Sequence, residues 1–219
     1  MKSRYYAVMI LLCIVTIFSK STTANADDRY VKLCERYFTE FAEDYGKFGQ
    51  KDGFTYLYSD KKNTATIVAI PMEQKKVAVP EKINGKTVTK IELMDVFSCS
   101  SNYYFRDEFY GEHEDNPVPK VEYLSIPKTV KVINIYAGIG LTEGYCGELQ
   151  SYLVHLKKFN VASANKWYRS YKGMLYTKNG KKLLLVPRKY MAKTVKVKKG
   201  TTKIADFAFS FCTNIKKVI

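Results

Sequence analysis

Few residues of this 219-residue chain have the types and spacing that catalysis needs. The two histidines, His113 and His155, lie far apart in the sequence, and neither has a second metal ligand at a familiar spacing. The one acid–base cluster is His113, Glu114 and Asp115, with Glu112 just before it. We interpret it as solvated charge, because acid–base catalysis needs groups that converge in a cleft. Without a nucleophile-elbow, zincin or phosphate-loop motif, the sequence predicts a non-catalytic protein with no cofactor and no metal site.

Three aromatic residues have two interpretations. Trp167, Tyr168 and Tyr171 could stack on a sugar ring, or they could cover the start of a hairpin that follows them. The second interpretation is the plainer one. The first keeps a secreted glycan-active enzyme, or an accessory domain of one, as the alternative function, with carboxylates from the 112–115 cluster.

The elements that would position any site are short and repeated. Residues 194–213 (TVKVKKGTTKIADFAFSFCT) combine an alternating strand, a turn at Gly200 and several apolar residues, including Ile204. A unit this small cannot bury its apolar side chains alone, so it must stack on copies of itself. Degraded copies begin near Val77 and Val121, and strand-like phrases recur at 156–161 and 215–219. We expect the buried strand positions to be Val77, Val79, Leu124, Ile126, Phe159, Val161, Val195 and Val197.

The combined pattern L-x-x-L-x-I-P-x-x-V-x-x-I-x-x-x-A-F-x-x-C resembles the bacterial BspA-like leucine-rich repeat family. One copy carries it through Val121, Leu124, Ile126, Pro127, Val130 and Ile133. Another carries it through Val195, Val197, Ile204, Ala208, Phe209, Cys212, Thr213, Asn214 and Ile215. The first of these copies departs from the pattern, with Gly138 and Leu141 in place of the Phe and the Cys. The resemblance covers roughly residues 52–219.

This resemblance implies a β-rich or α+β solenoid of short strands with tight returns, and it places the Phe209 ring inside the stack. Family members are typically secreted or surface-displayed and are implicated in adhesion to proteins or surfaces. Residues 51–71 and 172–187 look like hairpin inserts, because Gly53 and Tyr56 match Gly173 and Tyr176. The dipeptide at residues 179–180, Asn-Gly, is a strong hairpin-turn signal.

Three regions follow from the pattern along the chain. Residues 1–26 read as a signal peptide, with basic residues, a twelve-residue apolar run and a small-x-small cleavage site. Residues 27–50 contain an amphipathic helix over 27–46, which we expect to cap the stack. Residues 51–219 form the repeat domain, which ends on an incomplete repeat. We expect no transmembrane segment after the signal peptide is removed.

Cysteine usage leaves two possibilities open. After removal of the leader, Cys34, Cys99, Cys146 and Cys212 remain, and an exported chain permits disulfides in three pairings. We favour buried free thiols, because Cys99 and Cys212 stand where the repeat requires a small apolar residue and Cys34 lies on the apolar stripe of the predicted helix. Residues 100–120, rich in aromatic and acidic residues, and the glycine-rich residues 137–151 are insertions between repeats.

Charge is distributed unevenly. Residues 27–150 carry 16 basic and 20 acidic residues, whereas residues 151–219 carry 17 basic residues and one acidic residue, Asp206. This asymmetry suggests an anionic partner for the second half, although a solvated lysine-rich surface explains it equally well.

The sequence thus predicts an exported binding or adhesion protein. We expect its partners to be extracellular or surface proteins, or an anionic polysaccharide or wall polymer, rather than specific nucleic acid. Edge-to-edge self-association at the C-terminus is a further possibility. The residues expected to bind the ligand lie on one sheet face and near it: Lys157, Lys158, Asn160, Lys193, Lys196, Lys198 and Lys199.

Overall fold

The computed structural model describes residues 47–93, 118–134 and 152–219. These residues form fifteen strands: β1 (Lys47–Lys51), β2 (Phe54–Ser59), β3 (Thr64–Ala69), β4 (Lys76–Ala78), β5 (Lys82–Ile83), β6 (Lys86–Ile91), β7 (Tyr123–Ile126), β8 (Val132–Ile133), β9 (Lys158–Val161), β10 (Tyr168–Tyr171), β11 (Met174–Thr177), β12 (Lys182–Leu185), β13 (Thr194–Val195), β14 (Lys203–Ile204) and β15 (Lys217–Val218). The predicted signal peptide, the predicted helix and most of the two predicted insertions lie outside the described residues.

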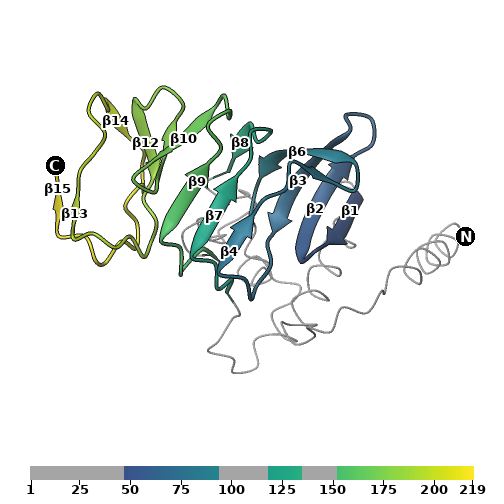
Figure 1. Cartoon of the computed structure of the whole chain (residues 1–219), viewed down its shortest axis with the longest axis horizontal. Coiled ribbons are helices and arrows are strands. Elements are labelled where there is room, and N and C mark those ends of the chain that lie inside the picture. Colours follow the sequence, from purple (N-terminus) through teal and green to yellow (C-terminus); the bar gives the residue numbers. More distant parts are fainter. Residues whose placement is uncertain (1–46, 94–117, 135–151) are drawn as a thin grey trace, which may run out of the picture.

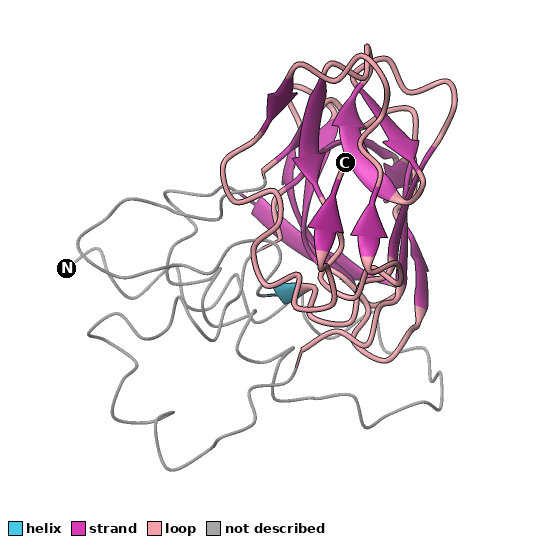
Figure 2. Cartoon of the chain, turned by 90° about the vertical axis from the view of Figure 1, so that its left-hand side faces the viewer, coloured by secondary structure: helices cyan, strands magenta, loops and turns pink. Residues whose placement is uncertain are grey.

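The strands form an elongated stack in which successive repeats follow one another along the long axis (Figure 1). Strands β4, β7 and β9 lie side by side near the middle, and β13, β14 and β15 lie at the end marked C. Figure 2 views the stack from this end and shows strands on opposite sides of a shared interior. The described part is therefore a β-rich stack of short strands, as the sequence predicts.

Three parallel strands contain the first apolar segment of each repeat. β4 pairs with β7 and β7 with β9, so that Val77, Leu124 and Phe159 are register neighbours. All three side chains are buried, with at most 1% of their surface exposed. Because side chains alternate along a strand, the residues on either side of them face outward. This register confirms the alignment of repeats that the sequence predicts.

A second parallel ladder carries the isoleucine that closes each repeat. Ile67 of β3, Ile91 of β6 and Ile133 of β8 are register neighbours, and all three are buried. They belong to the same apolar cluster as the first ladder. Strands of two to six residues are too short to persist alone, so burial against each other stabilises both ladders.

Two antiparallel meanders interrupt the repeats, and they are copies of each other. One is β1–β2–β3 and the other is β10–β11–β12. Each has a register shift at an equivalent place, between Thr55 and Tyr56 in the first and between Leu175 and Tyr176 in the second. The last strand of each then pairs in parallel with a repeat strand, β3 with β6 and β12 with β14. Both predicted hairpins, and the match of Tyr56 with Tyr176, are confirmed.

The turns of these meanders explain part of the sequence pattern. Lys172 and Gly173, between β10 and β11, have φ values of 50° and 85°. Positive φ at both central residues suits the twist of a two-residue hairpin. At the predicted Asn-Gly turn only Gly180 has a positive φ, 71°, because the loop between β11 and β12 spans residues 178–181 instead of two residues.

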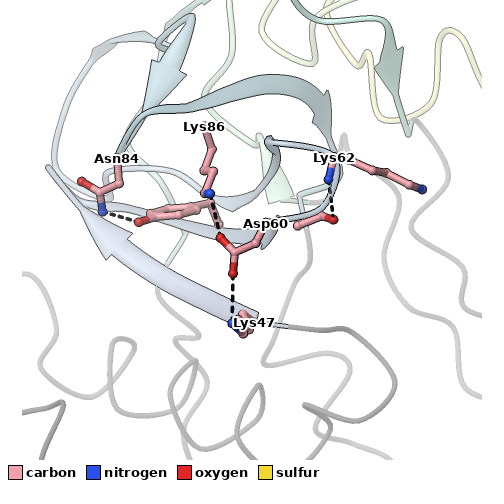
Figure 3. Close-up of polar contacts among 7 residues, drawn as sticks. Lys47, Asp60, Lys62, Asn84 and Lys86 are labelled. Atoms are coloured by element: carbon pink, nitrogen blue, oxygen red, sulfur yellow. Dashed lines mark hydrogen bonds and ion pairs between the residues drawn. The ribbon is translucent and has the colours of Figure 1, made fainter.

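Polar contacts tie the first meander to the repeat that follows it (Figure 3). The Asp60 carboxylate, at the β2–β3 turn, pairs with Lys86 Nζ of β6 at 2.7 Å and with Lys47 Nζ of β1 at 2.9 Å. Hydrogen bonds from Lys86 and then Lys47 hold the pKa of Asp60 below its usual value, and the same contact raises the pKa of Lys47. Asn84 Nδ2 donates to the Tyr56 phenol oxygen beside them.

The strand predicted over residues 194–199 is shorter than its alternation suggests. β13 ends at Val195, although Val197 N still donates to Ile219 O at 2.8 Å. Val197 lies beyond the strand end and Val161 is the last residue of β9, so both are half-buried where burial was predicted. The other six predicted strand positions are buried, which confirms them.

Two apolar positions of the last repeat are more exposed than the pattern predicts. Ile204 was expected in the core but is 49% exposed. β14 pairs with β12, and Ile204 belongs to neither of the two apolar clusters that the described residues form. The Phe209 ring is half-buried and packs against a second apolar cluster that contains Val195 and Ala208. The prediction of a fully enclosed ring is therefore wrong.

Candidate functional site

A groove of about 480 Å³ runs across the outward face of β4, β7 and β9. Its floor is the row Ala78, Ser125 and Asn160, which are register neighbours on the three strands. Small side chains in this row leave the backbone of the sheet accessible, and Ser125 and Asn160 add polar groups. Each floor residue directly follows a buried strand position, Val77, Leu124 or Phe159, so the alignment of the repeats brings the three together.

A second row borders the floor on the same face. Lys76, Tyr123 and Lys158 are register neighbours two residues before the floor residues, so they point the same way. The Lys76 ammonium lies 6.0 Å from the centre of the Tyr123 ring. Lys76 and Tyr123 line the groove. The border therefore combines an aromatic ring with positive charge, which is suited to an extended anionic ligand.

The stem of Lys158 is held by the second meander. A Cβ added to Gly173 would lie 3.0 Å from Lys158 Cγ, so the lysine stem crosses the β10–β11 turn at a residue without a side chain. Phe159 N also donates to Gly173 O at 2.9 Å. The left-handed turn thus positions one side of the three-stranded sheet of β4, β7 and β9.

Lys157, a predicted ligand residue, already has a partner. Its Nζ lies 2.9 Å from Glu122 Oε2, and both side chains are about one-third exposed or less. The hydrogen bond from Lys157 lowers the pKa of Glu122, and the same bond raises the pKa of Lys157. The pair is partly neutralised, so Lys157 contributes less to the charge of this face than the sequence suggests.

Four of the predicted ligand lysines, Lys193, Lys196, Lys198 and Lys199, do not line this groove. Lys198 N donates to the Tyr176 phenol oxygen at 3.2 Å, and its side chain crosses Gly180, whose added Cβ would meet Lys198 Cε at 2.8 Å. Because β13 ends at Val195, the strand alternation expected to align Lys196 with Lys198 does not reach them. The remaining two, Lys193 and Lys199, are exposed at the same end of the stack.

The aromatic residues before the second meander serve mainly in packing. The Tyr168 phenol oxygen accepts a hydrogen bond from Ile133 N at 3.1 Å, and Tyr171 meets Tyr176 edge-on at 6.1 Å. Trp167 is 38% exposed, and the Lys131 ammonium lies 5.6 Å from its ring centre. This arrangement favours the interpretation that these rings cover the hairpin.

Candidate catalytic groups are sparse in the described ranges. His155 is exposed, whereas His113 and its neighbouring acids lie outside those ranges. Among the described residues, no group of three His, Cys, Asp or Glu side chains is arranged to hold a metal ion. Nor does any helix in the described part have the length and apolarity needed to cross a membrane.

Cys212 is a free, half-buried thiol in the part of the chain that the structure describes; Cys34, Cys99 and Cys146 lie outside it. Burial raises the pKa of the Cys212 thiol to about 11. Its Sγ lies 3.5 Å from Val186 O. Such a thiol is a packing residue and a poor nucleophile.

Sequence reasoning missed Asn165, Lys76 and Tyr123. Lys76 and Tyr123 could have been predicted. They lie two residues before Ala78 and Ser125, and side chains two residues apart on a strand share one face. Asn165 is fully buried, and it donates to Pro127 O and Val130 O of another repeat, so no local pattern revealed these two contacts.

No protein-family model matches the sequence, and no curated protein matches it. Among solved structures, the pneumococcal vaccine antigen PcpA is similar at 15% identity and a TM-score of 0.34, over 79% of this chain and 64% of that chain. A leucine-rich repeat protein from Eubacterium ventriosum is similar at 16% identity and a TM-score of 0.38, over 78% of this chain and 58% of that chain. A leucine rich cell surface protein from Faecalibacterium prausnitzii is similar at 15% identity and a TM-score of 0.38, over 81% of this chain and 43% of that chain. The chain thus spans less than two thirds of each of these proteins.

Proposed function

We propose that this chain is an exported, non-catalytic repeat protein that binds an extended anionic ligand across the outward face of β4, β7 and β9. The observation that supports the proposal most is the groove, with its small polar floor and its border of Lys76, Tyr123 and Lys158. Export is proposed from the signal-peptide pattern at residues 1–26.

The ligand class follows from the shape and charge of this face. Three parallel strands about 4.8 Å apart make a surface that a polymer can follow along the stack, instead of an enclosed pocket for a small molecule. Lysines supply charge without the paired geometry of arginine, which favours a repeating anionic polymer over one specific carboxylate. We therefore propose an acidic polysaccharide or a wall polymer, with surface proteins of acidic character as the related class.

The glycan-active alternative requires catalytic groups that converge. Its candidates are His113, Glu112, Glu114, Asp115, His155 and Tyr171, and the first four lie outside the described residues. No observation in the described part favours this alternative.

The experiment is retention of the purified chain on heparin and on immobilised teichoic acid, over a range of salt concentrations. The double variant Lys76→Glu/Lys158→Glu should lose retention, and Ser125→Trp, which fills the floor without changing charge, should lose it as well. The charge-matched control is Lys61→Glu/Lys62→Glu, in the exposed turn between β2 and β3.

Three outcomes would contradict the proposal. Equal loss in the control would mean that only net charge matters, and full retention by Ser125→Trp would place the ligand elsewhere. Retention that does not fall as salt rises would contradict the electrostatic mechanism, since exposed charges are strongly screened. The variant Lys196→Glu/Lys198→Glu tests separately whether the basic end of the stack also contributes.

A further inference from the structure

Four turns lie side by side along one long edge of the stack. They are residues 127–131, 162–167, 178–181 and 198–201, and Figure 1 shows them along the upper side of the stack, beside β8, β10, β12 and β14. Neighbouring strands are about 4.8 Å apart, so the four turns make a ridge roughly 15 Å long. We call this surface the turn ridge. It shares no residue with the groove on β4, β7 and β9.

Hydrogen bonds join each turn to the next, and in every case a carbonyl oxygen of one turn is the acceptor. The three donor–acceptor pairs are Asn165 Nδ2 with Pro127 O at 2.8 Å, Lys178 N with Trp167 O at 2.7 Å, and Thr201 Oγ1 with Gly180 O at 3.3 Å. The four turns are therefore fixed relative to one another, and so are the side chains that project from them.

The turn ridge is rich in lysine and contains no carboxylate. Lys128, at its first turn, pairs with Glu81 at 3.3 Å. The other six lysines are Lys131, Lys166, Lys178, Lys181, Lys198 and Lys199. In the part of the chain that the structure describes, none of these six makes an ion pair with a carboxylate. Residues 151–205 contain neither Asp nor Glu, so this stretch cannot neutralise its own charge.

The first meander shows that the fold does not require this charge. Its β2–β3 turn is the counterpart of residues 178–181, and there the Asp60 carboxylate pairs with Lys86 and Lys47. The second meander keeps the strands and the register shift, but its turn has Lys178 and Lys181 and no acid. Because like charges that gather without a counter-ion oppose folding, the unneutralised lysines indicate an anion from outside the chain.

Trp167 lies in the middle of the turn ridge. Its N–H donates to Asn165 Oδ1 at 2.9 Å and its C=O accepts from Lys178 N, so the backbone that carries the ring is held on both sides. The residue is nevertheless 38% exposed, and the Lys131 ammonium lies 5.6 Å from the ring centre. An exposed aromatic ring among cations is suited to a ligand that combines flat rings with negative charge.

We propose that the turn ridge binds single-stranded nucleic acid without sequence preference. The lysines contact successive phosphates, and one base stacks on the exposed part of the Trp167 ring. Each of the four turns contributes at least one lysine, so the complementary chain carries a charge on every unit, as a phosphodiester chain does. Lysine makes diffuse charge contacts without the paired geometry of arginine, which suits a flexible ligand.

The assay follows the intrinsic fluorescence of the purified full chain during titration with oligothymidylate. Trp167 is the single tryptophan of the sequence, so a base that stacks on its ring quenches the emission directly. Anisotropy of a labelled oligomer gives the affinity. We expect an abasic oligomer with the same number of phosphates to bind about tenfold more weakly and to leave the emission unquenched. This comparison uses the wild type and does not depend on the folding of any variant.

Substitutions separate the stacking from the charge. Trp167→Leu should weaken the binding of oligothymidylate about tenfold and leave that of the abasic oligomer unchanged, whereas Trp167→Phe should keep most of the affinity. Lys166→Ala/Lys181→Ala should weaken the binding of both oligomers. It should also reduce the slope of log affinity against log salt by about 1.4, since each lost phosphate contact removes about 0.7. The matched control is Lys61→Ala/Lys62→Ala, in the corresponding turn of the first meander, and it should leave the slope unchanged.

Equal affinity for the two oligomers, unquenched emission on binding of oligothymidylate, or an equal change of slope in the control variant would each overturn the proposal. Equal affinity for the two oligomers together with competition by heparin fragments would show that the turn ridge takes an acidic polysaccharide instead. Loss of oligothymidylate binding in Lys76→Glu/Lys158→Glu would place the nucleic acid in the groove. That result would overturn this proposal and leave the proposed function of the groove intact.

Discussion

Replacing Asn165 with alanine should destabilise the fold strongly, because this one side chain makes four hydrogen bonds in the interior. Asn165 is fully buried. Its Nδ2 donates to Pro127 O at 2.8 Å and to Val130 O at 2.9 Å. Its Oδ1 accepts from Trp167 N at 2.9 Å and from Tyr168 N at 2.8 Å. It therefore joins the turn after β7 to the start of the second meander.

The size of the effect follows from these four bonds. Each contributes about 1 kcal/mol net, and each buried group left without a partner costs about 1–3 kcal/mol. Alanine leaves two carbonyl oxygens and two N–H groups unpaired, so we expect a loss of about 4 kcal/mol in the free energy of unfolding. That is a large part of the roughly 5–15 kcal/mol that stabilises an ordinary domain.

Asn165→Asp tests the two donated hydrogen bonds separately from the two accepted ones. The carboxylate keeps the two bonds that Oδ1 accepts, but it places negative charge against the carbonyl oxygens of Pro127 and Val130. The variant should be destabilised at neutral pH, and it should recover part of the loss on acidification, because a protonated carboxyl can donate one of the missing bonds.

The assay is urea denaturation followed by Trp167 fluorescence and far-ultraviolet circular dichroism. Asn160→Ala is the matched control, because Asn160 is half-buried on the groove face. It should change the free energy of unfolding by less than about 0.5 kcal/mol. A loss below about 1 kcal/mol in Asn165→Ala, or one equal to the control, would refute the reasoning.

Three further predictions concern single side chains. Phe209→Ala should cost about 2 kcal/mol in thermal unfolding, less than a fully buried ring would, because the ring is half-buried; a null shift would contradict its packing on the second cluster. The pKa of Asp60 is lowered, so its contribution is present above the unfolded value near 3.8 and is lost as pH falls through the folded value. Wild type should therefore exceed Asp60→Asn in stability at pH 7 but not at pH 2, and a constant difference in unfolding midpoint would oppose this. With its pKa raised to about 11, Cys212 should be alkylated at pH 8 much more slowly in the folded chain than in urea, as peptide mass mapping can show; equal rates would oppose its burial.

The register of the repeats could be predicted from the sequence, because it depends on the alternation of residues within each strand. The alternation around Val77, Leu124 and Phe159 depends only on the period of a strand, and the structure aligns these residues as predicted. The hairpins were readable for a similar reason, since glycine at residues 53 and 173 provides the left-handed conformation that a two-residue turn needs. The resemblance in sequence between the two meanders thus corresponded to a real copy in structure.

Exposure and pairing depended on contacts between distant repeats. Ile204 matches Ile133 in sequence, yet Ile133 is 8% exposed and belongs to the first apolar cluster, whereas Ile204 is 49% exposed and belongs to neither of the two clusters of the described residues. Lys157 and Lys158 are adjacent and look alike in sequence, but Lys157 pairs with Glu122 while Lys158 crosses Gly173.

The sequence by itself determined the β-rich stack, its register and the small residues along the groove floor, since these follow from periods of two and from turn residues. Only the tertiary structure decided which lysines border the groove and which lysine pairs with a carboxylate. Those properties belong to pairs of residues that are far apart in the chain, and a side chain acquires its partner only when the repeats stack.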